Sequence, residues 1–522
     1  MKEDVLADVT VAAESPSADH YLSTEHLRSS LGQRAARGGA FTLISQVITF
    51  VISLGATAVM ARLLTPQDYG LIGMVAVFTN FVAMFKDLGL STATIQKDQI
   101  TRDQISTLFW LNVALGAGVM AVAAALSPIV AWFYGDRRLL AITLVTSLGL
   151  LISGLAIQHE ALLRRQMRFL ALSTISLLSV IVGYIVGITF AWFRFSYWAL
   201  VFSQLGLVAF NTIAIWCACR WRPGWPRFRS GVGSMVRFGG NLTGFTTINY
   251  FSRNLDNLLI GRVWGAFQLG IYSRAYQLMM VPIDQVNTPI TSVAVPALSR
   301  LNDSPADYRK AYLRMLEKVA ILTMPGVALM IGCSDWIIGI VLGPQWHEAS
   351  RIFVLLGITG LVQPIANTTG WLFLSQGRSD RILKWGMISG PLTIASIIIG
   401  LPWGALGVAA TYTTVRVLIS EPLLFWFVGR TGPIRTMDFY TTIAPFLFAS
   451  GCVLLAILGF RQLHIVANPV LGIAICSGIA LVTDVIALLL VPAGRAALRD
   501  LKTLALMLGA QKRKEALANH SS

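Results

Sequence analysis

The chain has 522 residues, of which 55% are hydrophobic and only 13% are charged. A soluble domain carries about 25% charged residues, so this composition excludes a water-soluble globular protein. The net charge of +16 would suggest a nucleic-acid partner in a soluble protein. In a membrane protein, the preference of Lys and Arg for cytoplasmic loops predicts the same excess without nucleic acid.

Residues 1–38 are polar and lack the basic, then apolar, pattern of a signal peptide, so we expect a disordered cytoplasmic tail. The rest of the chain alternates apolar stretches with short polar connections. These stretches are about 20 residues long, which suits a helix that crosses the hydrocarbon core and does not suit barrel strands. The predicted spans are 40–61, 70–90, 108–133, 139–157, 170–193, 198–218, 236–261, 268–298, 315–342, 352–374, 383–401, 405–428, 439–460 and 469–491.

The expected fold is therefore an all-α polytopic membrane protein with about 14 transmembrane helices. Two six-helix bundles form a parallel repeat, and two C-terminal helices follow. The C-terminal stretch is basic and either lies on the anionic inner leaflet or is a solvated tail. The predicted parts are the tail 1–38, a lobe at 39–219, a basic cytoplasmic connection at 220–236, a second lobe at 237–429, two additional spans within 430–492, and the basic tail 493–522.

The distribution of Lys and Arg predicts the orientation. With both termini inside and 14 spans, 30 of the 41 basic residues fall in cytoplasmic segments and only six in outer connections. This bias indicates a bacterial inner-membrane protein with cytoplasmic termini. Five basic residues stay at membrane depth or its edge, and they are Lys86, Arg253, Arg274, Arg351 and Arg416.

An internal repeat supports the two lobes. RGGAFT at Arg37 recurs loosely as RFGGNLT at Arg237, and RLLTPQDYGL at Arg62 recurs as RVWGAFQLGI at Arg262. The matches share one offset of 200 residues, which also relates Gly70 to Gly270. Six spans separate the copies, and an even number means that both cross in the same direction, so the repeats are parallel.

Polar side chains form stripes within several spans. A charge at the bilayer centre costs about 2.5–3.5 kcal/mol on insertion scales, so such residues usually face a bundle interior or a hydrated cavity. We assign substrate binding to Asn249, Arg253, Asp256, Arg274, Gln277, Arg416, Lys86 and Asp87, and ion coupling to Asp284 and Glu421. Arginine suits a phosphate because its planar fork donates two parallel hydrogen bonds. The alternative is structural: Arg253 pairs with Asp256, and Lys86 and Arg274 extend to an interface.

The sequence offers no signature of an enzyme. It contains no nucleotide-binding loop, no Asp-x-Asp pair and no clustered metal ligands, so we expect neither catalysis nor a cofactor. The five cysteines fall in or beside apolar segments, and we interpret them as small apolar residues without a structural disulfide.

Two segments resemble a known family. ARLLTPQDYGLIGM (61–74) and LDNLLIGRVWGAFQLGIYSRAYQLMMVP (255–282) are similar to the polysaccharide-transport branch of the multidrug/oligosaccharidyl-lipid/polysaccharide exporters, and most of all to its colanic-acid-exporter-like lipopolysaccharide flippases. The resemblance extends from Arg37 to Gly432. It implies a flippase that moves an undecaprenyl-diphosphate-linked oligosaccharide to the periplasmic leaflet through a charged cavity. The implied partners are membrane lipids, a polysaccharide polymerase and a chain-length regulator.

Two other functions stay open. A cation-coupled small-molecule exporter of the same superfamily predicts a mostly acidic cavity, whereas the membrane-depth residues here are at least balanced towards basic. A membrane polysaccharide polymerase would need a large outer loop, and the predicted outer connections are short.

Overall fold

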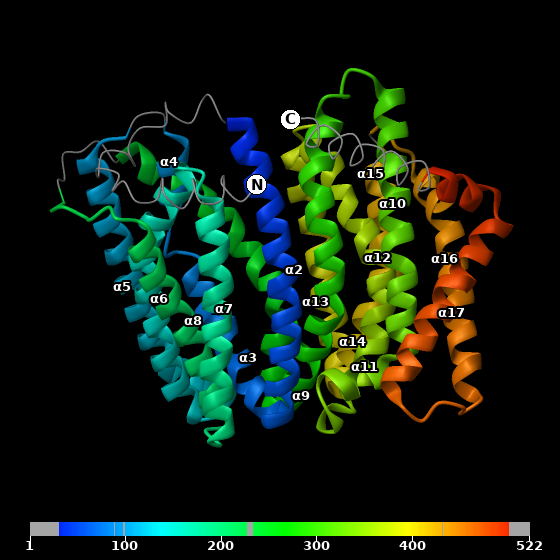
Figure 1. Ribbon diagram of the computed structural model, residues 1–522, viewed down its shortest axis with the longest axis horizontal. Helices are drawn as coiled ribbons and strands as arrows, with labels where there is room; N and C mark the ends of the chain where they lie inside the picture. The colour runs from blue at the N-terminus through cyan, green and yellow to red at the C-terminus, as the bar shows by residue number, and fades with distance from the viewer. Residues whose placement is uncertain (1–30, 88, 98–99, 227–232, 431, 501–522) are drawn as a thin grey trace, which may run out of the picture. The chain divides into compact units, whose positions relative to one another are not determined.

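The computed structural model describes residues 31–87, 89–97, 100–226, 233–430 and 432–500 (Figure 1). Side chains within these ranges are described except at 31–38, 40, 233–249, 251–253 and 379. The chain divides into two compact units, Met1–Gly270 and Ile271–Ser522. Most of the predicted N-terminal tail and the end of the predicted C-terminal tail lie outside the described residues.

The described residues are helical and contain no strand, which confirms the all-α prediction. The first unit contains α2 (Leu31–Leu63), α3 (Pro66–Ala83), α4 (Leu90–Gln96), α5 (Arg102–Tyr134), α6 (Arg138–Arg165), α7 (Phe169–Trp192) and α8 (Trp198–Ala218). Helix α9 (Gly233–Ser299) passes from the first unit into the second. The second unit continues with α10 (Pro305–Gly332), α11 (Ser334–Val341), α12 (Ala349–Ser375), α13 (Ser379–Gly400), α14 (Gly404–Val415), α15 (Glu421–Gly429), α16 (Thr436–Gln462) and α17 (Pro469–Leu490).

Each of the 14 predicted spans overlaps a described helix. Among the described residues, ten stretches are long and apolar enough to cross a membrane. The longest, Asp380–Gly429, holds two predicted spans that separate at Gly404, where φ is +74°. Helix α9 likewise holds the seventh and eighth predicted spans. Between these two spans its backbone leaves helical geometry at Gly265, where φ is +79°. The chain is thus a multi-pass membrane protein, and the number of 14 spans stays a prediction.

The second predicted span differs from the structure in its inner half. The prediction ran to residue 90, but α3 ends at Ala83 and the short helix α4 begins at Leu90. Gly89 between them adopts a left-handed conformation with φ +71°, which an L side chain rarely tolerates. Hydropathy alone did not place this break at Ala83, because Met84 and Phe85 continue the apolar stretch beyond the end of α3.

In the first unit, neighbouring helices pack as α5 on α6, α6 on α8, α8 on α7 and α7 on α2 (Figure 1). Small residues permit the close approach of these helices: Gly116 of α5 faces Gly154 of α6, and Gly183 of α7 faces Ser203 of α8. Lipid tails are as apolar as leucine, so association in a membrane depends on this tight packing more than on a hydrophobic driving force.

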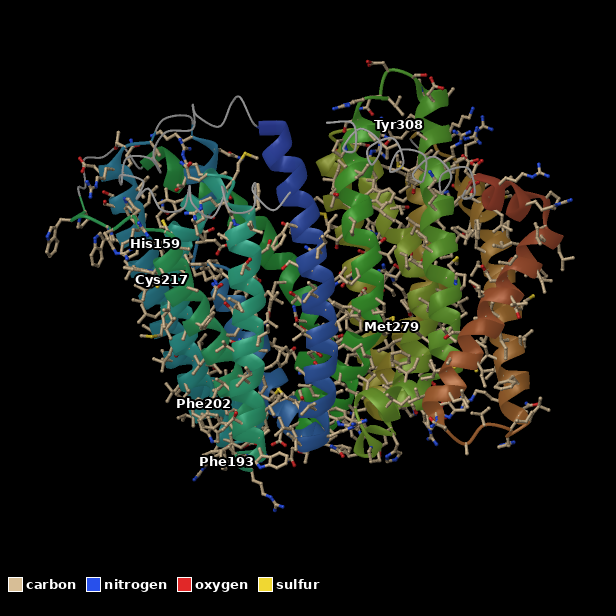
Figure 2. All side chains as sticks on the ribbon, in the orientation of Figure 1. His159, Phe193, Phe202, Cys217, Met279 and Tyr308 are labelled. Atoms are coloured by element: carbon tan, nitrogen blue, oxygen red, sulfur yellow. The ribbon has the colours of Figure 1, made fainter. Side chains whose placement is uncertain are left out.

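In the second unit, α10 contacts α12, α16 and α17. The hydroxyl groups of Tyr312 (α10) and Thr368 form a hydrogen bond of 2.7 Å. The Tyr312 ring meets the Phe439 ring of α16 edge-on, with 6.0 Å between the ring centres. Phe439 also stacks on Phe425 at 4.6 Å. Tyr308, at the start of α10, hydrogen-bonds Ser375 at 2.6 Å (Figure 2). The additional helix α16 is therefore part of the core of this unit.

Arginine–aspartate pairs fix α16 at both ends. At one end Arg309 of α10 donates Nε to Asp438 Oδ2 at 2.8 Å, and the same carboxylate caps the backbone N–H of Arg435 at 2.8 Å. At the other end Arg461 donates to the Gly332 carbonyl and pairs with Asp335, each at 2.6 Å. The Arg461 guanidinium also lies 4.3 Å from the centre of the Trp336 ring.

Replacement of Asp438 by Ala is expected to destabilise the second unit by about 1–2 kcal/mol, because it removes the cap at the start of α16 together with the partner of Arg309. The measurement is thermal unfolding of the purified protein in detergent. Lys384→Gln is the matched control, since Lys384 and Asp380 form an exposed pair at 3.1 Å, which contributes little to stability. Equal apparent Tm values for the two variants would contradict the assigned role of Asp438.

Candidate functional site

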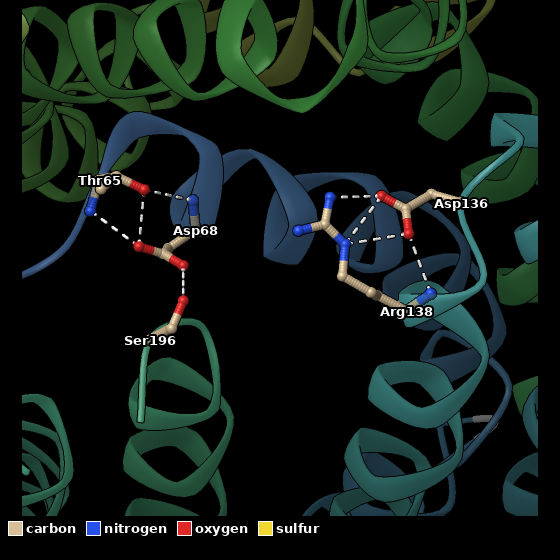
Figure 3. Close-up of polar contacts among 5 residues, drawn as sticks. All are labelled: Thr65, Asp68, Asp136, Arg138 and Ser196. Atoms are coloured by element: carbon tan, nitrogen blue, oxygen red, sulfur yellow. Dashed lines mark hydrogen bonds and ion pairs between the residues drawn. The ribbon is translucent and has the colours of Figure 1, made fainter. Parts of the chain in front are cut away.

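The segment 61–74, which carries the family resemblance, starts helix α3. Thr65 is the N-cap, Pro66 occupies the first turn, and Asp68 completes a capping box: the Asp68 N–H donates to Thr65 Oγ1 at 3.3 Å, and the Thr65 N–H donates to Asp68 Oδ2 at 2.8 Å (Figure 3). Proline suits this turn because its missing N–H would be unpaired there in any case. The T-P-x-D pattern therefore defines where α3 begins.

Asp68 also ties α3 to the turn between α7 and α8. The Ser196 hydroxyl donates to Asp68 Oδ1, and Ser196 has a positive φ of 51° (Figure 3). Nearby in the same view, Arg138 Nη2 lies 2.7 Å from Asp136 Oδ2 in the connection between α5 and α6. The hydrogen bond from Arg138 holds the pKa of the Asp136 carboxyl below its ordinary value. These contacts order one end of the first unit.

The repeat-related glycines Gly70 and Gly270 make reciprocal close contacts within the first unit. A Cβ atom on Gly70 would overlap the backbone carbonyl of Ala266, and a Cβ atom on Gly270 would overlap the backbone carbonyl of Pro66. Pro66 and Ala266 are themselves 200 residues apart. The offset found in the sequence thus corresponds to a physical pairing, in which each copy of the motif packs its glycine against the backbone of the other copy.

The sequence did not identify a buried polar network behind α4. Asn112 Nδ2 donates to Gln158 Oε1 at 3.3 Å, and Gln158 Nε2 donates to Thr94 Oγ1 at 3.0 Å. Arg165 donates to the Thr94 carbonyl at 3.1 Å and to the carbonyl of Lys97, where α4 ends. The network joins Thr94 of α4, Asn112 of α5 and two residues of α6, so no pattern within one segment could show it. A cation at these carbonyls caps α4.

Lys86 and Asp87 lie in the turn between α3 and α4. The Lys86 ammonium donates to Ser153 Oγ of α6 at 3.4 Å. The Asp87 carboxylate accepts from the Ser91 N–H at 3.0 Å and from its hydroxyl at 2.5 Å, so it supports the first turn of α4. Asp87 therefore has a clear structural role, whereas Lys86 places a half-buried cation where the second span is broken.

The predicted stripe on the seventh span is described only in part. The side chains of Asn249 and Arg253 lie outside the described residues. Asp256 is half-buried, and its Oδ1 accepts from the Asn257 N–H at 2.8 Å. One turn before Arg253, the Tyr250 hydroxyl donates to the Val77 carbonyl of α3 at 2.8 Å. This face of α9 thus lies against α3.

The eighth span carries an internal pair. Arg274 Nη1 donates to Gln277 Oε1 at 2.7 Å, so two predicted binding residues meet directly. Further along the same helix, Asp284 is exposed. Asn287 is only 7% exposed, and neither atom of its amide has a hydrogen-bond partner among the described residues.

The predicted residues Arg416 and Glu421 form a buried ion pair in the second unit. Arg416 Nε lies 2.6 Å from Glu421 Oε1, and the Glu421 side chain is only 2% exposed. Residues Arg416–Ser420 form a π-helical turn between α14 and α15. Pro422 explains this turn, because its ring has no N–H to continue the α-helical ladder. The wider turn brings residues five apart onto one side of the helix.

Several polar atoms in and around this ion pair lack an aligned hydrogen bond among the described residues. Tyr412 and Tyr276 lie close enough to Arg416 to interact with it electrostatically. Among the described residues, the Ser420 hydroxyl and both Glu421 oxygens have no aligned hydrogen bond. A buried polar group without such a partner is costly, so in native proteins it usually binds water, an ion or a ligand. The Arg416 side chain is 21% exposed, and a guanidinium group can donate hydrogen bonds to a phosphate.

Metal ligation receives no support from the side-chain geometry. Over the described part of the chain, no three His, Cys, Asp or Glu side chains come together as a possible metal site. The polar groups of the candidate site are guanidinium, ammonium, carboxylate, amide and hydroxyl groups, which suit hydrogen bonding to phosphates and sugars.

Comparison with known proteins adds independent information. A family model described as polysaccharide biosynthesis protein matches residues 59–351. The teichuronic acid biosynthesis protein TuaB of Bacillus subtilis (strain 168) is 27% identical over 460 residues, which cover 86% of this chain and 94% of that protein. The lipopolysaccharide biosynthesis protein WzxC of Escherichia coli (strain K12) is 27% identical over 402 residues, which cover 76% and 81%.

The fold is also similar to solved structures. The lipid II flippase MurJ, in an inward closed conformation, superposes with a TM-score of 0.64 at 13% sequence identity, and the match covers 87% of this chain and 98% of that one. At this identity the similarity establishes the fold alone.

The close contact of the two motifs predicts that Gly70→Ala and Gly270→Ala destabilise the protein by similar amounts, because each methyl group would collide with backbone. Overpacking of this kind costs about 1–3 kcal/mol or more, which thermal unfolding in detergent can detect. Gly73→Ala is the control on the same helix, since its Cβ would meet only the Leu269 side chain at 3.4 Å. If Gly73→Ala is as harmful as Gly70→Ala, the reciprocal contact is not the cause.

Proposed function

Because the chain belongs to the family of polysaccharide biosynthesis proteins, we propose that it is a flippase for an undecaprenyl-diphosphate-linked oligosaccharide. It would move a repeat unit of an exopolysaccharide or O-antigen from the cytoplasmic to the periplasmic leaflet of the bacterial inner membrane. Both termini would be cytoplasmic, and a polysaccharide polymerase and a chain-length regulator would act on the product. The relatives named above support the polysaccharide class, and the fold supports transport.

The observation that carries this proposal is the Arg416–Glu421 pair in a π turn at membrane depth. A transporter of lipid-linked sugars must hold a diphosphate where water is scarce, and arginine offers a planar fork that remains charged there. The paired acid lowers the cost of the cation before substrate binds. Lys86, Arg253, Asp256 and the Arg274–Gln277 pair are proposed as further contacts for the diphosphate and the sugars.

Alternating access requires the two repeats to part at one end of the molecule at a time. The contact of residues 66–70 with 266–270 is a suitable place for such parting, since its closest approaches are between a glycine of one copy and the backbone of the other. We place this contact at the outer end, because the outer connections of the predicted topology include Arg62 and Arg262.

Ion coupling is assigned to Glu421 and Asp284. Binding of the diphosphate to Arg416 would compete with its ion pair and leave Glu421 as a buried carboxylate, which a proton or a cation would then neutralise. Substrate and coupling ion would thus be linked through one guanidinium. Asp284 lies on α9 and is exposed. In this proposal it faces the same lumen.

The function is tested by deletion in the native host. Loss of the protein should stop export of the polymer and accumulate lipid-linked repeat units on the inner leaflet. Detection of the units by extraction and by leaflet-specific labelling distinguishes a flippase from a polymerase, whose loss would accumulate single units on the outer leaflet. A gain of resistance to cationic dyes on expression, with normal polymer export after deletion, would favour the small-molecule exporter.

The role of Arg416 is tested with the charge-neutral double variant Arg416→Gln/Glu421→Gln. A single Arg416→Gln change leaves a buried unpaired acid and is expected to lower stability by about 3–5 kcal/mol. The double variant removes both charges, so it should accumulate in the membrane nearly as the wild type does. Transport of the lipid-linked unit in proteoliposomes should nevertheless fall about 10–100-fold, as expected for the loss of a charge-assisted phosphate contact.

Glu421→Gln alone separates coupling from binding. It keeps Arg416 available for substrate, so substrate-dependent thermal stabilisation should persist while the dependence of transport on an ion gradient is lost. Transport at the wild-type rate by the double variant would show that Arg416 does not bind the substrate. The proposed function would be unaffected, because the deletion tests it independently.

A further inference from the structure

One end of the second unit carries a pocket that the proposed transport site does not use. It is shallow and open to solvent, with an empty volume of about 270 Å³. Its wall comes from the end of α12, the start of α13 and the connection between α15 and α16. The transport residues Arg416 and Glu421 do not line it, and neither do Arg274 and Asp284.

The lining of this pocket is amphipathic. Arg378 and Arg381 supply two guanidinium groups, while Leu372, Phe373 and Val428 supply apolar surface. Behind them Phe427 contacts Phe373 at 6.4 Å and Trp385 at 5.9 Å between ring centres. Tryptophan and basic residues at the end of a membrane helix are typical of the depth of lipid headgroups.

The start of α13 adds further preference for an anion. Arg378 is its N-cap residue and provides no side-chain cap for the N–H groups of the first turn. A helix N-terminus favours negative charge, because its N–H groups point outward and its dipole is positive there.

An acyl chain would find a continuous surface along α13. Leu383 and Met387 lie four residues apart on one face of this helix, and their side chains are 43% and 66% exposed. The pocket also lies at the basic end of the unit, near Arg309, which we expect to face the anionic cytoplasmic leaflet. Guanidinium groups above an apolar helix face are complementary to a phosphodiester that carries acyl chains.

We propose that this pocket binds the headgroup of an anionic phospholipid, with Arg378 and Arg381 on the phosphate and the acyl chains along α13. Basic pockets between helices on the cytoplasmic side are known to hold such headgroups. The bound lipid would link the ends of α12, α13 and α15 at the membrane surface. This site is independent of the transport function proposed above.

The test uses the purified full-length protein and lipid vesicles or mixed micelles of stated composition. Phosphatidylglycerol should raise the apparent Tm by several degrees relative to phosphatidylcholine, and Arg378→Gln/Arg381→Gln should lose most of this shift. Arg300→Gln/Lys310→Gln is the matched control, because it removes the same charge from exposed residues at the same end of the unit and should keep the shift.

Three results would overturn the proposal: an equal shift with phosphatidylcholine, a full shift in Arg378→Gln/Arg381→Gln, or an equal shift with inorganic phosphate alone, which would indicate a free-anion site. A second measurement needs no variant. A photoactivatable phosphatidylglycerol should label peptides that contain residues 372–387 or 428–434 of the wild-type protein, and labelling confined to other helices would also overturn the proposal.

Discussion

The absence of water from the hydrocarbon core is the constraint on which this structure depends. Every backbone polar group must be satisfied inside a helix, and every charge must find a partner in the protein or reach an interface. The long helices meet the first requirement. The second requirement explains the partners of three arginines within the helices: Arg416 meets Glu421, Arg274 meets Gln277, and Arg165 meets the end of α4.

The same constraint determines how the helices associate. Because lipid tails are as apolar as the helices, the hydrophobic effect does not drive one apolar helix onto another, and small residues are needed for close contact. Gly70 and Gly270 are the strongest example, since each allows backbone to touch backbone where any side chain would collide. The capping box at Thr65 and Asp68 sets the start of α3 in register for that contact. The family motif therefore encodes a packing geometry, which is consistent with its lack of catalytic groups.

In the proposed function, the π turn at Arg416 serves both the stability of the second unit and substrate binding. A regular α-helix would separate Arg416 from Glu421, and Pro422 prevents the regular helix from forming. The resulting pair is stable enough to exist within the membrane and retains acceptors without aligned hydrogen bonds. Such a site can exchange one partner for another, which is what transport of a charged substrate demands. The additional helices α16 and α17 support the same unit by packing along α10.

The sequence by itself determined that the protein is a helical, multi-pass membrane protein, because lipid imposes strong and local requirements on composition, and it also contained the 200-residue repeat. It also identified Arg416, Glu421 and the Arg274–Gln277 stripe, since a charge inside an apolar stretch is conspicuous. Tertiary structure alone decided which residues meet. The break after Ala83, the network of Asn112, Gln158 and Arg165, and the place of α16 in the core all depend on contacts between distant segments. Hydropathy measures the affinity of a residue for lipid, whereas these features depend on the shape and hydrogen bonding of its neighbours.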